Sequence, residues 1–203
     1  MIRPDTLLEW TWPSEMRPWR LPSRRVGDAD TSGPWDAEPD KRQWIDDATS
    51  LPCLMHRGTL GSWCGYVGVA PGHRFHRKAA DKIADHVHAH GGINFAEGCQ
   101  ASDDPAMGVC HVAPGAHDKV WWIGFDCAHV GDMLPGMFRL HEIIPALGGL
   151  PKFTRGYTYR DLAYVECEVT ELARQLSLSR DALAAESSKR LDAFMTRLLA
   201  TKK

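Results

Sequence analysis

Short apolar runs separated by glycine and proline constrain the fold of this chain most. Two of them, WCGYVGV at 63–69 and KVWWIGFDC at 119–127, are typical of strands, and 86–95 and 107–112 are expected to be strands as well. A glycine pair interrupts 86–95, which suggests a bulge there. The spacing predicts a small, mainly antiparallel sheet, and a short helix is expected within 74–85.

The C-terminal part carries a helical pattern. Apolar residues recur at steps of three and four, which predicts an amphipathic helix over about 159–177. A second helix is expected over about 180–200, and its inner face would carry Leu183, Leu191, Phe194, Leu198 and Leu199. Packing is the expected role of both helices, and partner binding by the last is the alternative. The fold class is therefore α+β, with two C-terminal helices after the sheet.

The first 50 residues differ in composition from the rest. They hold six of the 13 prolines and five of the eight tryptophans. Proline at this density excludes a long helix or a central strand. We therefore expect residues 1–50 to form an irregular extension packed on the core, and 51–203 to form one domain with a His/Cys-rich sheet (51–151) and a helical end (152–203). An aromatic surface that grips a partner is the alternative for the extension.

Charge and hydropathy exclude several classes of protein. The 203 residues have a formal net charge of −2, so no basic field is present for general nucleic-acid binding. No run of about 18 apolar residues predicts a membrane span, and the start does not resemble a secretory signal. We expect a cytoplasmic protein with reduced cysteines.

Histidine is distributed unevenly along the chain. All ten histidines lie between His56 and His141, and five of the six cysteines lie in nearly the same window, between Cys53 and Cys127, so any chemistry is expected there. If 86–95 is a strand, His86, His88 and His90 share one face about 7 Å apart, and two of them could share a metal ion where the strand bends. A row of half-exposed edge histidines is the alternative.

The segment 121–132 carries the densest set of reactive side chains. Asp126, Cys127, His129 and Asp132 follow an apolar strand, where chains commonly build sites. Because neighbouring residues of a strand face opposite ways, Asp126 is expected to group with His129 and Asp132 rather than with Cys127. His73 follows another strand and would sit at a rim.

Several standard motifs are absent from the sequence. There is no H-E-x-x-H, no C-x-x-C and no H-x-E with P-C-x-x-C, and neither a P-loop, a G-x-G-x-x-G nor a G-x-S-x-G occurs. The common zinc-protease, zinc-ribbon, deaminase, nucleotide-cradle and serine-hydrolase sites are therefore excluded.

Four segments together resemble a group of small proteins encoded by bacteriophages and prophages: GYVGVAPGH (65–73), HGGINFA (90–96), VWWIGFDCAHVGD (120–132) and YRDLAYVECEVTELARQL (159–176). The resemblance covers about residues 60–177. It implies a phage accessory protein acting in a bacterial cytoplasm, and implies no activity. By matching positions it points to His73, His90, Asp126, Cys127, His129 and Asp132.

Three functions remain open on these residues. In the first, the protein is a metal-assisted hydrolase or transferase acting on a phosphate ester or nucleotide-like substrate. The divalent ion, such as zinc or manganese, is held by His90, Asp126, His129 and Asp132, and His73 is a ligand or proton carrier. In the second, Cys127 is a nucleophile, with His90 or His129 as base and an aspartate as orienting acid.

The third function is not catalytic. The protein would then bind a small signalling molecule or a host bacterial protein, for example a defence factor. The candidate catalytic groups are thus Cys127, Asp132 and His73, and the candidate metal ligands are His90, Asp126 and His129.

Overall fold

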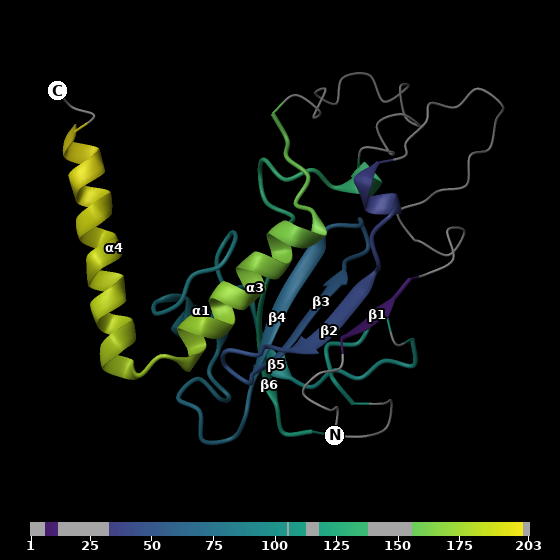
Figure 1. Cartoon of the computed structure of the whole chain (residues 1–203), viewed down its shortest axis with the longest axis horizontal. Helices are drawn as coiled ribbons and strands as arrows, with labels where there is room; N and C mark the ends of the chain where they lie inside the picture. The colour runs from purple at the N-terminus through teal and green to yellow at the C-terminus, as the bar shows by residue number, and fades with distance from the viewer. Residues whose placement is uncertain (1–6, 12–32, 105, 113–117, 138–155, 201–203) are drawn as a thin grey trace.

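The computed structural model describes residues 7–11, 33–104, 106–112, 118–137 and 156–200. They form one six-stranded antiparallel sheet in the order β1-β2-β3-β4-β6-β5 (Figure 1). The strands are β1 (Leu8–Trp10), β2 (Lys41–Ile45), β3 (Pro52–Arg57), β4 (Trp63–Val69), β5 (Phe95–Gly98) and β6 (Trp121–Asp126). The helices are η2 (Pro34–Asp36), α1 (Ala80–Ala84), α3 (Leu162–Ser177) and α4 (Arg180–Ala200). The predicted α+β class is confirmed.

The main core lies between the sheet and α3, which crosses its centre (Figure 1). The predicted apolar stripe is confirmed, since Val165, Val169, Leu172 and Leu176 are all buried. Gly65 on β4 permits the close approach of the helix, because a Cβ there would come within 2.6 Å of both Phe125 and Val169. Such contact distances force neighbouring groups to move.

The start of α3 is fixed to the sheet by one carboxylate. Glu38 accepts hydrogen bonds from Trp63 Nε1, from the Tyr159 hydroxyl and from the backbone N–H of Leu162, and it also pairs with the buried Arg57. Asp161 caps the helix by accepting from the Tyr164 N–H. The residues just before and within the first turn of α3 are therefore held in a defined position over the sheet.

The N-terminal 50 residues contribute more regular structure than predicted. β2 lies inside the sheet between β1 and β3, and its register with β3 pairs Ile45 with Pro52 across the expected boundary at residue 50. The stretch from 40 to 51 contains no proline, so its N–H groups are available for pairing. Trp35 is buried, and its ring lies 5.2 Å from the Tyr159 ring. Residues 12–32 of the extension lie outside the described residues.

Two of the expected strands are mostly absent from the described chain. Residues 85–94 form turns and loop, because Gly91 and Gly92 both adopt positive φ, at 65° and 97°, and only Phe95–Gly98 pairs with β6. In the second segment, Val109 makes only an isolated bridge to Gln100. The prediction that His86, His88 and His90 share one strand face is therefore wrong.

The last helix has the predicted extent but not the predicted packing. α4 leaves the end of α3 and projects away from the sheet (Figure 1). Leu183 is buried, whereas Leu191 and Phe194 are each 61% exposed, so the expected inner face ends near the first turn. The Leu198 and Leu199 side chains lie outside the described part.

One further expectation fails at the cysteines. Cys99 and Cys110 form a disulfide, so the prediction that all cysteines are reduced is wrong for this pair. Cys53, Cys64, Cys127 and Cys167 are free. Among the described residues, no helix combines the length and the apolar character needed to cross a membrane.

Candidate functional site

Three side chains from two loops converge beside the first turn of α3. His90 lies in the loop between α1 and β5, whereas His129 and Asp132 lie in the loop that follows β6. Each offers a ligand atom, and these atoms all lie within 4.8 Å of one another. Of the four residues that the sequence analysis grouped as ion ligands, His90, His129 and Asp132 therefore lie together, and Asp126 is not part of this group.

Asp132 is the buried centre of this group. Its Oδ2 lies 2.7 Å from His90 Nε2 and accepts from the backbone N–H of His129 at 3.0 Å, while its Oδ1 accepts from Arg160 Nε at 2.8 Å. Burial acts to raise the pKa of this carboxyl, but the hydrogen bonds from Arg160, His90 and the His129 backbone outweigh it and hold the pKa below its usual value. Asp132 is thus an anion at neutral pH.

His90 is oriented through both ring nitrogens. Its Nε2 contacts Asp132, and its Nδ1 lies 2.9 Å from the hydroxyl of Tyr164 on α3. Burial raises the pKa of Tyr164, so the phenol remains protonated. A phenol and a carboxylate on opposite sides of an imidazole fix the orientation of its ring.

The His129 ring carries an unsatisfied nitrogen. Its Nδ1 is buried and makes no hydrogen bond within the described part of the chain. It lies 3.6 Å from Asp126 Oδ1 and 3.7 Å from Asp132 Oδ2, which is too long for a hydrogen bond. A buried polar nitrogen without a partner is uncommon, and here it faces two carboxylates.

Gly91 makes room for this imidazole. A Cβ at residue 91 would lie 2.0 to 2.4 Å from atoms of the His129 ring, whereas a Cβ at Gly92 would meet nothing within 4 Å. The two histidine-bearing loops therefore touch through a glycine backbone.

The second loop is held by the segment that precedes α3. Asp132 forms a parallel bridge with Thr158, whose N–H donates to Gly131 O at 2.8 Å and whose carbonyl accepts from the Met133 N–H at 2.9 Å. Gly131 adopts φ 98°, a conformation that other residues rarely take. This pairing brings Arg160 beside Asp132.

Asp126 stands at the rim of the group. It is the last residue of β6, and its carboxylate accepts from the Asn94 side chain and from the Ala128 N–H. Its side chain is 35% exposed, and its Oδ1 lies 3.6 Å from His129 Nδ1. The strand alternation that separates it from Cys127 is observed, because Cys127 packs into the core beneath α3.

The other two catalytic candidates lie apart from this arrangement. Cys127 is buried, and burial raises the pKa of its thiol, so a thiolate is disfavoured. The His73 ring contacts Leu176 O and the Phe75 N–H at the far end of α3. Leu176 and Tyr164 are separated by 12 residues of helix, about 18 Å of axial rise. His73 therefore lies far from His90 and Asp132 in this structure.

His86 and His88 are exposed and do not enter the group. The backbone of His88 is instead held by Gln175 of α3, whose side chain accepts from the His88 N–H at 2.9 Å and donates to its carbonyl at 3.0 Å. This pair of hydrogen bonds fixes the loop two residues before His90.

Sequence reasoning did not identify Arg160, Tyr164 or Gly91 as site residues. Arg160 and Tyr164 are four residues apart around the start of α3, and that spacing puts side chains on one side of a helix. The guanidinium lies over the Tyr164 ring, 4.8 Å from its centroid. The i, i+4 spacing of Arg160 and Tyr164 could have been noticed in the sequence. No neighbouring sequence pattern, however, indicates that this pair lies beside residues 90 and 132.

Comparison of the chain with protein-family models, with curated proteins and with solved structures gives no match in any of the three.

Proposed function

We propose that the protein is a metal-dependent hydrolase or transferase, in which His90, His129 and Asp132 bind a divalent cation such as zinc or manganese. The observation that carries this proposal is the buried Nδ1 of His129, which has no hydrogen-bond partner among the residues that the structure describes and faces two carboxylates. Two donors bound about 2.0–2.1 Å from a tetrahedral ion lie roughly 3.3 Å apart, close to the 3.7 Å between His129 Nδ1 and Asp132 Oδ2.

The surroundings of these donors suit metal binding. Tyr164 supports His90 through the nitrogen that would not bind the ion, and Arg160 supports Asp132 through the opposite carboxylate oxygen. Such partners orient ligands. Because His90 Nε2 donates to Asp132 in this structure, that nitrogen must lose its proton before it can bind the ion. When bound, the ion would supply an activated water and a positive charge for the substrate oxygen.

Asp126 has the position of an additional acid–base group. It is more exposed than Asp132, and its Oδ1 lies 3.6 Å from His129 Nδ1. From there it can accept a proton from a nucleophile, or complete the ligand set.

The position of Arg160 favours an anionic substrate. Its Nε is engaged by Asp132, and the hydrogen bond to that carboxylate raises the guanidinium pKa further. A fixed cation beside a metal site favours a phosphate ester or nucleotide-like substrate. From the resemblance of residues 60–177 to phage-encoded proteins, we infer that the reaction takes place in a bacterial cytoplasm.

The test is turnover of phosphate esters. Protein stripped by a chelator and reloaded with zinc or manganese is assayed with p-nitrophenyl phosphate, with bis-p-nitrophenyl phosphate and with nucleoside monophosphates. We expect metal-dependent product release that Asp132→Ala abolishes and His88→Ala leaves unchanged. Metal-loaded protein that turns over none of these substrates would reject the proposed substrate class, and metal binding would be judged separately.

A further inference from the structure

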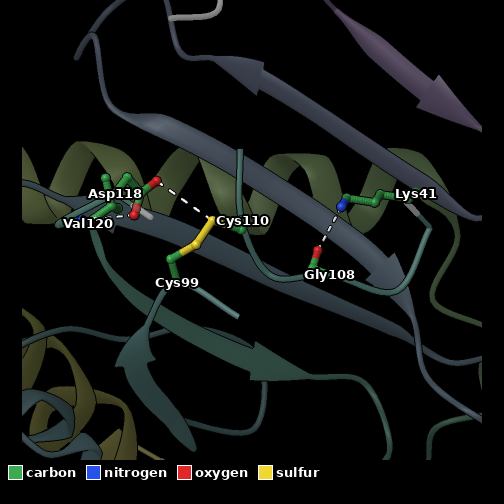
Figure 2. Close-up of a disulfide and its surroundings, with 6 residues drawn as sticks. All are labelled: Lys41, Cys99, Gly108, Cys110, Asp118 and Val120. Atoms are coloured by element: carbon green, nitrogen blue, oxygen red, sulfur yellow. Dashed lines mark hydrogen bonds between the residues drawn. A yellow bond between two sulfur atoms is a disulfide. The ribbon is translucent and has the colours of Figure 1, made fainter. Parts of the chain in front are cut away.

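A second cluster of metal-binding side chains lies at the other end of β5 and β6. Cys99 follows β5, Asp118 precedes β6, and Cys110 lies between them on a returning loop (Figure 2). One ligand atom from each residue lies within 4.8 Å of the other two. The cluster shares no residue with the group formed by His90, His129 and Asp132.

The strand register brings the three residues together. β5 and β6 pair antiparallel, with Gly98 opposite Trp121, so the chain on either side of this pair converges. Gln100 and Val109 form an isolated bridge that returns Cys110 to Cys99. The cluster is therefore set by backbone pairing as well as by the disulfide.

The carboxylate of Asp118 is aimed at sulfur. Its Oδ1 accepts from the Val120 N–H at 3.1 Å, which orients the group, and its Oδ2 lies 3.7 Å from Cys110 Sγ (Figure 2). A disulfide sulfur carries no proton to donate. Asp118 therefore gains no hydrogen bond from this contact while the disulfide is intact, and it gains one, or shares a cation, only after reduction.

The loop between the two cysteines has anchors of its own. The buried Lys41 on β2 donates from Nζ to Gly108 O at 2.6 Å (Figure 2). Val109 belongs to a buried cluster with Leu54, Tyr66 and Trp122. The loop is consequently held in place by contacts that do not depend on the disulfide, so reduction leaves the two thiols close together.

We propose that Cys99, Cys110 and Asp118 form a redox-controlled zinc site, which is closed as a disulfide and binds the ion when reduced. In the reducing step two thiol groups of a reductant become a disulfide, and Cys99 and Cys110 each gain a hydrogen. Zinc then binds both sulfurs as thiolates and displaces their two protons. Two thiolates select a thiophilic ion, and the carboxylate supplies a third donor.

Cobalt(II) is the probe, because its thiolate-to-metal charge-transfer absorption appears only when sulfur binds the ion. Cys167, the exposed free cysteine, is first replaced in a Cys167→Ser background. After reduction by a phosphine, we expect one equivalent of cobalt with this absorption, displaced by zinc. With the disulfide intact, we expect no thiolate-to-cobalt absorption.

Variants assign the signal. Cys110→Ser should abolish the absorption, and Asp118→Asn should weaken the cobalt binding that this absorption reports at least tenfold. His129→Ala should leave the absorption unchanged. Absence of the absorption from reduced protein with an unaltered circular dichroism spectrum would overturn the proposal, as would its persistence in Cys110→Ser. The group formed by His90, His129 and Asp132 contains no sulfur, so either failure leaves the proposed function untouched.

Discussion

His90 Nε2 lies 2.7 Å from Asp132 Oδ2, and this contact joins loops that are 42 residues apart in the sequence. Each residue also makes a hydrogen bond through its other polar atom, His90 Nδ1 with the Tyr164 hydroxyl and Asp132 Oδ1 with Arg160 Nε. The contact is therefore supported by the start of α3, which Glu38 fixes to the sheet.

Asp132→Asn tests the central role of this carboxylate. The amide cannot accept from Arg160, His90 and the His129 N–H as a carboxylate does, so we expect a loss of about 1–3 kcal/mol in the free energy of unfolding. Metal affinity should fall by at least about tenfold. Denaturant titration and metal titration measure the two effects.

Asp126→Asn is the matched control for that substitution. Asp126 is 35% exposed against 2% for Asp132, so its replacement should cost less than about 1 kcal/mol of stability. Equal losses in the two variants would show that burial does not distinguish the two carboxylates.

Gly91→Ala should displace the His129 ring. Alanine at residue 91 is strained by the positive φ and also collides with the His129 imidazole. Alanine at residue 92 is strained by the positive φ but meets no neighbouring atom within 4 Å. We expect both variants to lose about 1–2 kcal/mol from the left-handed backbone conformation, and only Gly91→Ala to lose metal affinity in addition. Metal titration separates them, and similar affinities in the two variants would argue against the packing of His129 on Gly91.

Gln175→Met should loosen the loop that carries His90. Methionine matches the size of glutamine but cannot pair with the N–H and carbonyl of His88. Leaving these groups without partners should cost about 1–3 kcal/mol of stability. Hydrogen exchange should speed up at His88 while the amides of β3 stay protected, and unchanged protection at His88 would contradict the assigned pairing.

Stability should depend on pH through a histidine distant from the site. His56 is buried, its Nδ1 donates to Arg57 O and its Nε2 accepts from the Tyr66 hydroxyl. Burial lowers the pKa of His56 to about 4. Between about pH 6.5 and 4, His56 is therefore protonated in the unfolded chain but not in the folded chain. Its contribution to the free energy of unfolding is complete above about pH 6.5 and is lost as the pH falls toward 4.

The size of this effect is about 3 kcal/mol for the shift of His56, at 1.36 kcal/mol per pH unit. His56→Gln should flatten the dependence in that window, while His88→Gln, at an exposed position, should not. Denaturant unfolding between pH 4 and 7 measures both. An unchanged slope in His56→Gln would assign the dependence to another group, such as His111, whose pKa burial also lowers to about 4.

The sequence predicted the elements with regular periodicity and the grouping that depends on one strand. Because β6 ends at Asp126, strand alternation correctly separated Asp126 from Cys127 and directed attention to His129 and Asp132. The same alternation failed for His86, His88 and His90, since two positive-φ glycines prevent a strand there. A glycine pair can end a strand as readily as it can form a β-bulge within it, and the periodicity of the sequence does not distinguish these two outcomes.

The remaining partners could not be predicted because they depend on long-range pairing. Arg160 reaches Asp132 only through the bridge between Asp132 and Thr158, and Tyr164 reaches His90 across 74 residues. His73 looked equivalent to His90 in the sequence, since both lie beside glycine in a His-rich window. Only the packing of α3 separates them.

Metal stoichiometry in protein with the Cys99–Cys110 disulfide intact tests most directly whether His90, His129 and Asp132 bind an ion. After equilibration with zinc or manganese and removal of excess, elemental analysis should find close to one equivalent in the wild-type chain and in His88→Ala, and almost none in His129→Ala. Less than about a tenth of an equivalent of either metal in wild-type protein, or equal metal in wild type and His129→Ala, would contradict the proposed site.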